Sequence, residues 1–256
     1  MATPVTPPTK GARPCRLEER WPWSPGPIAA SDKLTPAPLV ERGAHTVYAG
    51  ARHPEDVCDP DVTPLKLDIT SPEQVANAAR DCGGLTLLIN NAAEARLSPL
   101  IGAGSLEDAR AQMETNYFGT LAMCQAFAPV LARNGGGALV NMCSIISFFN
   151  RPSIGSCCAS KAALWSITNG IRIELRPQGT LVLGVHAGFI DTRNAVGFHG
   201  PKHAPADIAA QVLDAIEAGQ EELLADEQTR RMKPALPRDQ ELIYPDVEKQ
   251  WLEARG

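Results

Sequence analysis

Long apolar runs are missing from this 256-residue sequence, which has no eighteen consecutive apolar residues. A transmembrane helix needs about 20 such residues, so no membrane span is indicated. An excess of positive charge is missing too, since 24 Lys and Arg stand against 29 Asp and Glu. The net charge of −5 gives no argument for nucleic acid as a partner. The first residues also lack the charged-then-apolar pattern of a secretory signal.

Cysteine pairs with the spacing of a zinc site are also missing, although the chain has seven cysteines. Only Cys157 and Cys158 are adjacent. This odd, scattered set predicts reduced thiols in a cytoplasmic protein and no metal site. Free cysteine is among the most buried residue types, so most of the seven are expected to be small core residues.

Glycine is scarce in the first forty residues, which contain only Gly11 and Gly26 but nine of the chain's 22 prolines. Proline fixes φ and removes the N–H group that a helix or a central strand requires. Residues 1–38 are therefore predicted to be an irregular Pro-rich segment, and residues 21–27 to form no regular element. Residues 39–256 are predicted to form one domain, without repeats.

Beyond residue 38, strand-like and helix-like runs alternate, which predicts an α/β fold with a doubly wound parallel sheet. Strands are expected at 45–51, 62–69, 85–89, 138–143, 180–186 and 221–225. One helix is expected to end at Gly43, and four others are expected to span 71–81, 105–132, 156–170 and 207–219. The run 85–89 is apolar throughout, as in a parallel strand covered on both faces.

Three polar residues combine in one pattern around the strand 138–143. Ser144 follows this strand directly, Cys157 comes thirteen positions later, and Lys161 four positions after that. Residues four apart share a helix face, so Cys157 and Lys161 are expected to point into the same space near Ser144. The spacing resembles the active site of the short-chain dehydrogenase/reductase family, whose pattern is Ser followed by Tyr-x-x-x-Lys. Cys157 occupies the tyrosine position.

Other motifs extend this resemblance from about residue 39 to the C-terminus. Residues 90–93, Asn-Asn-Ala-Ala, resemble the family's Asn-Asn-Ala-Gly, and residues 187–192, Ala-Gly-Phe-Ile-Asp-Thr, resemble Pro-Gly-x-x-x-Thr. Asn116 matches the family's active-site Asn, although a buried, satisfied amide is the alternative interpretation. The family's Thr-Gly-x-x-x-Gly-x-Gly turn is absent, so the first strand and glycine loop of this Rossmann-like fold are expected to be atypical or missing.

The resemblance implies hydride transfer between a nicotinamide cofactor and a carbonyl or alcohol carbon. The implied catalytic residues are Asn116, Ser144, Cys157 and Lys161. The implied cofactor-binding residues are Arg52, Asp68, Ile69, Asn90, Ala92, Lys161, Gly188, Ile190 and Thr192. Arg52 favours NADP(H) over NAD(H), because a guanidinium suits the extra phosphate and no Asp or Glu ends the strand 45–51. A lone surface Arg is the alternative.

Cys157 changes the expected chemistry. A thiol titrates near pH 8.5 against about 10 for a phenol, and the Lys161 ammonium is expected to lower its pKa further. Its reach is short, since the sulfur lies one bond beyond Cβ and a proton donor must come within about 2.6–3.2 Å. The resemblance therefore predicts weakened oxidoreductase activity on a small molecule.

Two other functions stay open from the sequence. The chain could be a non-catalytic member of the family that binds a nucleotide or a partner subunit. It could instead be a cysteine-based acyl or thiol enzyme, for which His186 is the nearest candidate base. The family resemblance also implies a homodimer or homotetramer, with the helix face near Asn116 at the interface.

Overall fold

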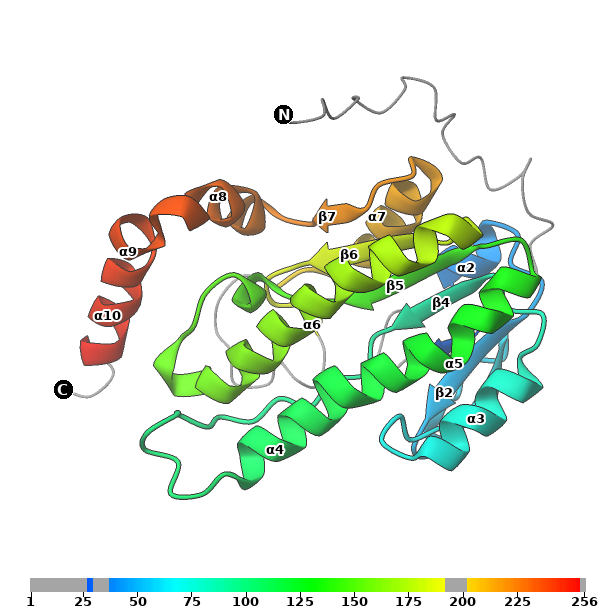
Figure 1. Cartoon of the computed structure of the whole chain (residues 1–256), viewed down its shortest axis with the longest axis horizontal. Coiled ribbons are helices and arrows are strands. Elements are labelled where there is room, and N and C mark those ends of the chain that lie inside the picture. The colour runs from blue at the N-terminus through cyan, green and yellow to red at the C-terminus, as the bar shows by residue number, and fades with distance from the viewer. Residues whose placement is uncertain (1–26, 30–36, 192–201, 254–256) are drawn as a thin grey trace, which may run out of the picture.

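A computed structural model describes residues 27–29, 37–191 and 202–253 of the chain. Over these ranges the structure has one seven-stranded parallel sheet in the order β3-β2-β1-β4-β5-β6-β7 (Figure 1). The strands are β1 Pro27–Ala29, β2 Val47–Ala51, β3 Val62–Lys66, β4 Leu87–Asn90, β5 Ala138–Met142, β6 Leu181–His186 and β7 Glu222–Leu224. The predicted doubly wound α/β fold is confirmed.

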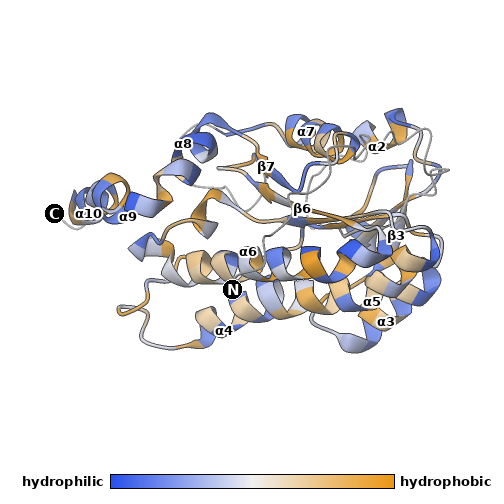
Figure 2. Ribbon diagram, turned by 45° about the horizontal axis from the view of Figure 1, so that its top comes forward, coloured by the Kyte–Doolittle hydropathy of each residue, from blue (hydrophilic) through white to orange (hydrophobic). Residues whose placement is uncertain are grey.

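Helices cover both faces of the sheet (Figure 2). They are α2 Ala37–Glu41, α3 Pro72–Asp81, α4 Glu107–Met113, α5 Thr120–Arg133, α6 Gly155–Leu175, α7 Pro205–Glu217, α8 Glu227–Ala235, α9 Asp239–Leu242 and α10 Tyr244–Glu253. Along β4, Leu87 and Ile89 join the core that includes α2 and α7, whereas Leu88 joins the core that includes α3, α5 and α6. Because both faces are buried, this strand reads as a continuous apolar run.

The first strand position is filled from the segment predicted to be irregular. Residues Pro27–Ala29 form β1 in the middle of the sheet, where Ile28 pairs with Ala49 of β2 and with Ile89 of β4. The prediction is therefore wrong at these three residues, because Pro27 begins the strand, a position that tolerates proline's missing N–H. Residues 1–26 and 30–36 lie outside the described part of the chain.

Two predicted helix ends are confirmed. Gly43 has φ of +84° just after α2, and its N–H donates to the carbonyl oxygen of Val40. Only glycine adopts that left-handed conformation readily, which explains the stop. At the start of α3, the Ser71 side chain accepts a hydrogen bond from the N–H of Gln74, as the cap pattern predicts.

The long helix predicted over 105–132 is interrupted. Between α4 and α5 the chain makes a π-helix, η2, at Glu114–Gly119, and the helix begins after Leu106 rather than at a Ser105 cap. Gly119 lies close to Ile69, because a Cβ atom added to this glycine would meet the Ile69 Cγ1 atom at 2.8 Å. Short π-helices within α-helices often mark functional sites, and this one contains Asn116.

The C-terminal helices α8, α9 and α10 extend along one end of the molecule (Figure 1). Tyr244 of α10 accepts a hydrogen bond of 3.4 Å from the N–H of Asn150 through its hydroxyl oxygen. Arg151 donates a hydrogen bond of 3.0 Å to Oε1 of Gln250. The tail thus packs against the loop that leads into α6.

Candidate active site

The buried face of α6 carries Cys157 and Lys161 one turn apart, as their spacing predicts. Their exposed fractions are 7% and 8%. The Nζ atom of Lys161 donates a hydrogen bond of 2.7 Å to the carbonyl oxygen of Met142, the last residue of β5. Ser144 lies two residues further along the chain. The structure therefore brings the Lys161 ammonium and Ser144 to the carboxyl edge of the sheet, where ligands of such folds bind.

Burial controls the protonation of both side chains. It lowers the pKa of Lys161 below its ordinary value, against the opposing effect of the Cys143 and Cys157 thiols. Burial also raises the pKa of Cys157, and the positive charge of Lys161 offsets only part of that rise. The prediction that Lys161 makes this thiol more acidic is therefore wrong in its net result, because desolvation outweighs the charge. Cys157 is a protonated thiol at neutral pH.

The burial of the cysteines agrees with their interpretation from the sequence as core residues. Within the described residues six cysteines are free thiols, and all of them except Cys58 are buried. Burial raises the pKa of Cys143 to about 11 and of Cys124 to about 12. These thiols are small core side chains without the acidity of a reactive cysteine.

Ser144 stands at the turn between β5 and the short helix η3, Ile145–Ser147. Its hydroxyl donates to the carbonyl oxygen of Ala187 at 3.3 Å and accepts from the N–H of Ile146 at 3.4 Å. Both bonds are long, so the hydroxyl is held loosely. A substrate oxygen that accepted its proton would have to replace the Ala187 carbonyl.

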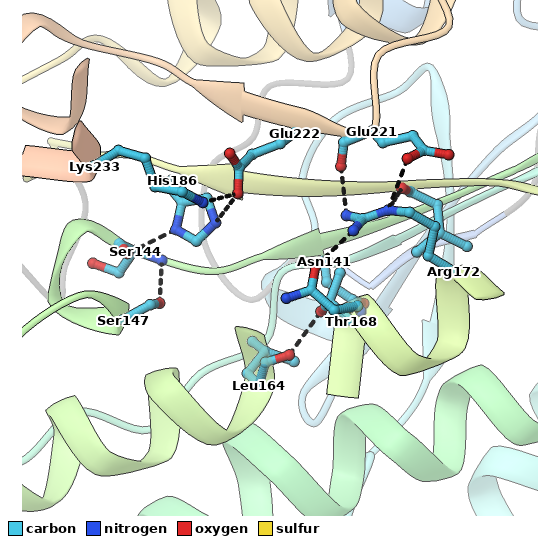
Figure 3. Close-up of polar contacts among 12 residues, drawn as sticks. Asn141, Ser144, Ser147, Leu164, Thr168, Arg172, His186, Glu221, Glu222 and Lys233 are labelled. Atoms are coloured by element: carbon cyan, nitrogen blue, oxygen red, sulfur yellow. Dashed lines mark hydrogen bonds and ion pairs between the residues drawn. The ribbon is translucent and has the colours of Figure 1, made fainter. Parts of the chain in front are cut away.

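His186 lies behind Ser144 in a fully buried position at the end of β6. Its Nδ1 atom is 3.1 Å from the carbonyl oxygen of Ser144, and since a carbonyl only accepts, this nitrogen carries the proton (Figure 3). Its Nε2 atom lies 3.7 Å from Oε1 of Glu222. The ring stacks on Phe148 with 4.3 Å between centroids. One nitrogen thus faces the Ser144 carbonyl and the other faces Glu222, so the geometry gives a cysteine nucleophile no base in His186.

Acid is expected to destabilise the fold through His186. Burial lowers its pKa to about 4 from an ordinary 6.5, so the unfolded chain binds this proton first as the pH falls. Stability present above pH 6.5 is therefore lost toward pH 4, by about 3 kcal/mol from this group. Urea unfolding at several pH values should show a steeper acid loss for the wild type than for His186→Gln, which cannot titrate. Equal pH slopes would contradict this assignment.

Asn116 is fully buried inside η2, and its amide is satisfied. Oδ1 accepts from the N–H of Glu94 at 2.8 Å, and Nδ2 donates to the Glu94 carbonyl oxygen at 2.9 Å. Nδ2 also donates to the hydroxyl of Ser160 at 2.8 Å, which in turn donates to the carbonyl oxygen of Cys157. Asn116 therefore joins the loop after β4 to α6. This is the satisfied amide weighed as the alternative, and it stands where the resemblance expects the catalytic Asn.

A chain of amides crosses the sheet toward α6. Asn90 Nδ2 donates to Asn141 Oδ1 at 2.9 Å, and Asn141 Nδ2 donates to the hydroxyl of Thr168 at 2.9 Å (Figure 3 shows the latter pair). Asn90 Oδ1 is buried and has no hydrogen-bond partner within the described residues. A buried acceptor without a partner is rare in a folded protein, and a bound group that donates a hydrogen bond would satisfy it. Ala92, two residues on, is half-buried.

Arg52, Asp68 and Ile69 lie together at the ends of β2 and β3. Lys66 donates a hydrogen bond from Nζ to the carbonyl oxygen of Arg52, whose own side chain is exposed. Burial raises the pKa of Asp68, but hydrogen bonds from Thr70 and the charges of Arg52 and Lys66 outweigh it, so the pKa lies below the ordinary value. Thr70 occupies only Oδ1 of Asp68, at 2.9 Å and 2.7 Å. The Oδ2 atom of Asp68, which Thr70 leaves open, and the cationic side chains of Arg52 and Lys66 therefore lie together at the ends of β2 and β3.

Gly188 and Ile190 lie at the opposite end of the site, after β6. The Gly188 N–H donates a hydrogen bond of 2.6 Å to Oδ2 of Asp226, and Ile190 forms a parallel bridge with His203. Thr192 lies outside the described residues. Sequence reasoning missed Asp226, because nothing local marks a residue whose partner Gly188 lies 38 positions away. It also missed Glu222, which meets His186 only in the folded sheet.

The family resemblance assigns these positions to the two ends of a nicotinamide dinucleotide. Arg52, Asp68 and Ile69 would hold the adenosine end, while Lys161 and the segment 188–190 would hold the nicotinamide end. The unpartnered Asn90 acceptor lies in β4, whose carboxyl end forms part of the same edge. The seven residues that follow β1, 30–36, include no glycine, so the sequence lacks the close-approach turn usual for the pyrophosphate.

A parallel sheet with polar groups gathered at its carboxyl edge defines a Rossmann-type ligand-binding protein. The model of the short chain dehydrogenase family matches residues 37–199. The chain belongs to this family, as the spacing of Ser144 and Lys161 predicts.

Known relatives agree with this assignment. A short chain dehydrogenase from Burkholderia cenocepacia J2315, solved in complex with NADP, superposes with a TM-score of 0.82 at 39% identity, covering 88% of this chain and 97% of that one. An uncharacterized oxidoreductase of Staphylococcus aureus strain USA300 is 30% identical over 191 residues, 70% of this chain and 82% of its own length. The short chain dehydrogenase mpl6 of Monascus purpureus is 28% identical over 228 residues, 82% of this chain and 76% of that protein.

Membership places the chain among oxidoreductases that use a nicotinamide cofactor, act on small molecules and are often oligomeric. In the described ranges, no helix combines the length and the apolar character needed to cross a bilayer.

Proposed function

We propose that this chain is an NADP(H)-dependent oxidoreductase that acts on a carbonyl or alcohol substrate with weakened activity. The observation that carries the proposal is the placement of the Lys161 ammonium on the Met142 carbonyl, beside Ser144 at the carboxyl edge of β5. In such enzymes the cofactor supplies or accepts the hydride, and the protein supplies position and electrostatics.

The chain's own residues have distinct roles in this proposal. The Ser144 hydroxyl turns from the Ala187 carbonyl to donate to the substrate oxygen. Lys161 orients the nicotinamide ribose with the donor protons that the Met142 carbonyl leaves free. Cys157, as a protonated thiol of short reach, delivers the hydroxyl proton through an intervening water. Asn116 holds the loop after β4 against α6 through its amide hydrogen bonds.

The direct test is a calorimetric titration with NADPH, followed by an assay of carbonyl reduction. Binding with slow turnover supports the proposal. Binding without turnover favours the second candidate, a non-catalytic family member. That candidate is favoured by the buried Cys157 thiol, whose pKa is raised and which stands in place of a phenol.

NADP(H) is expected to bind more tightly than NAD(H). Arg52 follows β2 with an exposed side chain, and Lys66 places a second cation beside it, which suits a 2′-phosphate. Losing a charge-assisted bond of about 1.5–3 kcal/mol should weaken NADPH roughly ten- to hundredfold in Arg52→Ala and leave NADH unchanged. Arg80→Ala, which removes an exposed arginine from α3, is the matched control. Equal wild-type constants for the two cofactors would contradict the preference, as would unchanged NADPH binding in Arg52→Ala.

We also propose a cytoplasmic homodimer or homotetramer. The free thiols suit a reducing compartment. Phe118 in η2 is half exposed, and its ring packs edge-on against Tyr117 with 4.8 Å between centroids. An exposed aromatic ring on this helix suits a contact between subunits. Sedimentation analysis of the wild type and of Phe118→Glu tests it, since the charge should dissociate the oligomer.

A further inference from the structure

Two adjacent residues after β6, Ala187 and Gly188, form hydrogen bonds on opposite sides of the chain through their peptide groups. On one side, the Ala187 carbonyl oxygen accepts from the N–H of Ile145 at 2.9 Å and from the Ser144 hydroxyl at 3.3 Å. On the other side, the next N–H, that of Gly188, donates to Oδ2 of Asp226 at 2.6 Å. The same few atoms therefore connect Ser144 to the junction between β7 and α8.

Asp226 is a buried carboxylate that uses both oxygens. It is 4% exposed, and its Oδ1 atom accepts from the N–H of Thr229 at 2.7 Å as the N-cap of α8. Its Oδ2 atom receives the Gly188 N–H and lies 3.4 Å from Nε2 of His203. An N-cap needs one acceptor, and serine or asparagine serves as well as aspartate. The cap alone therefore does not explain why a charged carboxylate is buried here. The separate N–H donors of Thr229 and Gly188, one on each oxygen, do explain it.

The groups that Asp226 holds also form a small ladder. The His203 N–H donates to the Phe189 carbonyl oxygen at 2.8 Å, and the Asp191 N–H donates to the His203 carbonyl oxygen at 2.9 Å. Asp226 contacts this ladder through His203 and the adjoining segment through Gly188. A Cβ atom added to Gly188 would lie 3.2 Å from Oδ2, so the backbone approaches the carboxylate closely. One side chain thus contacts both Gly188 and His203, the residue whose backbone pairs with Phe189 and Asp191.

We propose that Asp226 is a positioning residue for the nicotinamide end of the cofactor. The inference rests on the proposed function, in which the backbone around Ile190 holds the nicotinamide. Asp226 touches neither cofactor nor substrate in this role. It holds the Gly188 peptide group at one end of that segment and His203 at the other, so the segment keeps its shape before the ligand arrives.

The test compares two ligands that differ only in the nicotinamide. Dissociation constants of NADP+ and of 2′-phospho-ADP-ribose are measured by calorimetry on the full chain and on Asp226→Ser. Serine retains a cap acceptor but is too short to reach Gly188. NADP+ should bind about tenfold or more weakly to the variant, whereas 2′-phospho-ADP-ribose should change by less than about twofold. A role limited to stability would weaken both ligands equally.

Two further variants keep the result interpretable. Thr229→Ala removes the other half of the capping box and leaves the Asp226–Gly188 bond, so it should not separate the two ligands. Asp226→Asn, used if the serine variant does not fold, keeps a single acceptor oxygen for the donors of Thr229, Gly188 and His203 and should separate the two ligands as well. Equal weakening of both ligands, or no change, overturns the role of Asp226. A wild type that binds both ligands equally also overturns it, while a wild type that binds neither overturns the proposed function itself.

Discussion

Cys157→Tyr is expected to raise the turnover of a reactive carbonyl at saturating NADPH by about 10²–10⁴-fold, the usual contribution of a general acid or base. Lys161 already binds the carbonyl of Met142 at the carboxyl end of β5, two residues before Ser144. What Ser144 and Lys161 lack is a proton donor of sufficient reach, since the Cys157 thiol is short, buried and of raised pKa. A phenol at this position would extend beyond its Cβ by a whole ring, and the Lys161 charge would lower its pKa toward working pH.

Cys157→Phe is the matched control for this gain. It adds the same ring without a hydroxyl, so any rate increase that comes only from filling space would appear in both variants. The double variant Cys157→Tyr with Lys161→Ala should lose the gain, because the phenol then lacks its neighbouring cation. Melting temperatures of all variants are compared, since a ring replaces a side chain that is only 7% exposed. If Cys157→Tyr binds NADPH like the wild type and turns over no faster, the non-catalytic function is favoured.

The sequence predicted the relation between Cys157 and Lys161 because helical periodicity is local. Four positions along a helix place two side chains on one face wherever the helix lies. The pKa of Cys157 did not follow from the same argument, since it depends on how far the rest of the chain removes the thiol from water. Lys161 alone predicts a more acidic thiol, while its buried surroundings give a less acidic one.

Residues that are distant in sequence were likewise hidden from local patterns. His186 could be identified as a polar residue at a strand end, but its partners Ser144 and Glu222 meet it only after β5, β6 and β7 align. Asp226 has an ordinary helix-capping pattern, and its second bond to Gly188 requires the tertiary fold. The proline-rich start misled for a related reason, because β1 is short and its pairing to β2 and β4 outweighs weak local propensity.

Grafting the family's glycine-rich turn is expected to tighten NADPH binding by several hundredfold or more. In β1, Ala29 pairs with Asn90 of β4, which places the carboxyl end of this strand at the edge where the site lies. Residues 30–36 contain no glycine, so the sequence lacks the residues that usually let backbone N–H groups approach a pyrophosphate closely. Two charge-assisted hydrogen bonds, each worth roughly 1.5–3 kcal/mol, account for the size of the gain.

The graft replaces residues 30–37 by the pattern Thr-Gly-x-x-x-Gly-x-Gly, and its control carries alanine at each of the three glycine positions. Only the glycine version should gain affinity, because a Cβ atom keeps the phosphates at a distance. Adenosine 2′-monophosphate, which has no pyrophosphate, should bind equally to wild type, graft and control. The wild type itself is expected to bind NADPH more weakly than low-micromolar. A tighter wild-type constant would show that another segment already does the work of the turn, and the weakened activity would then trace to Cys157 alone.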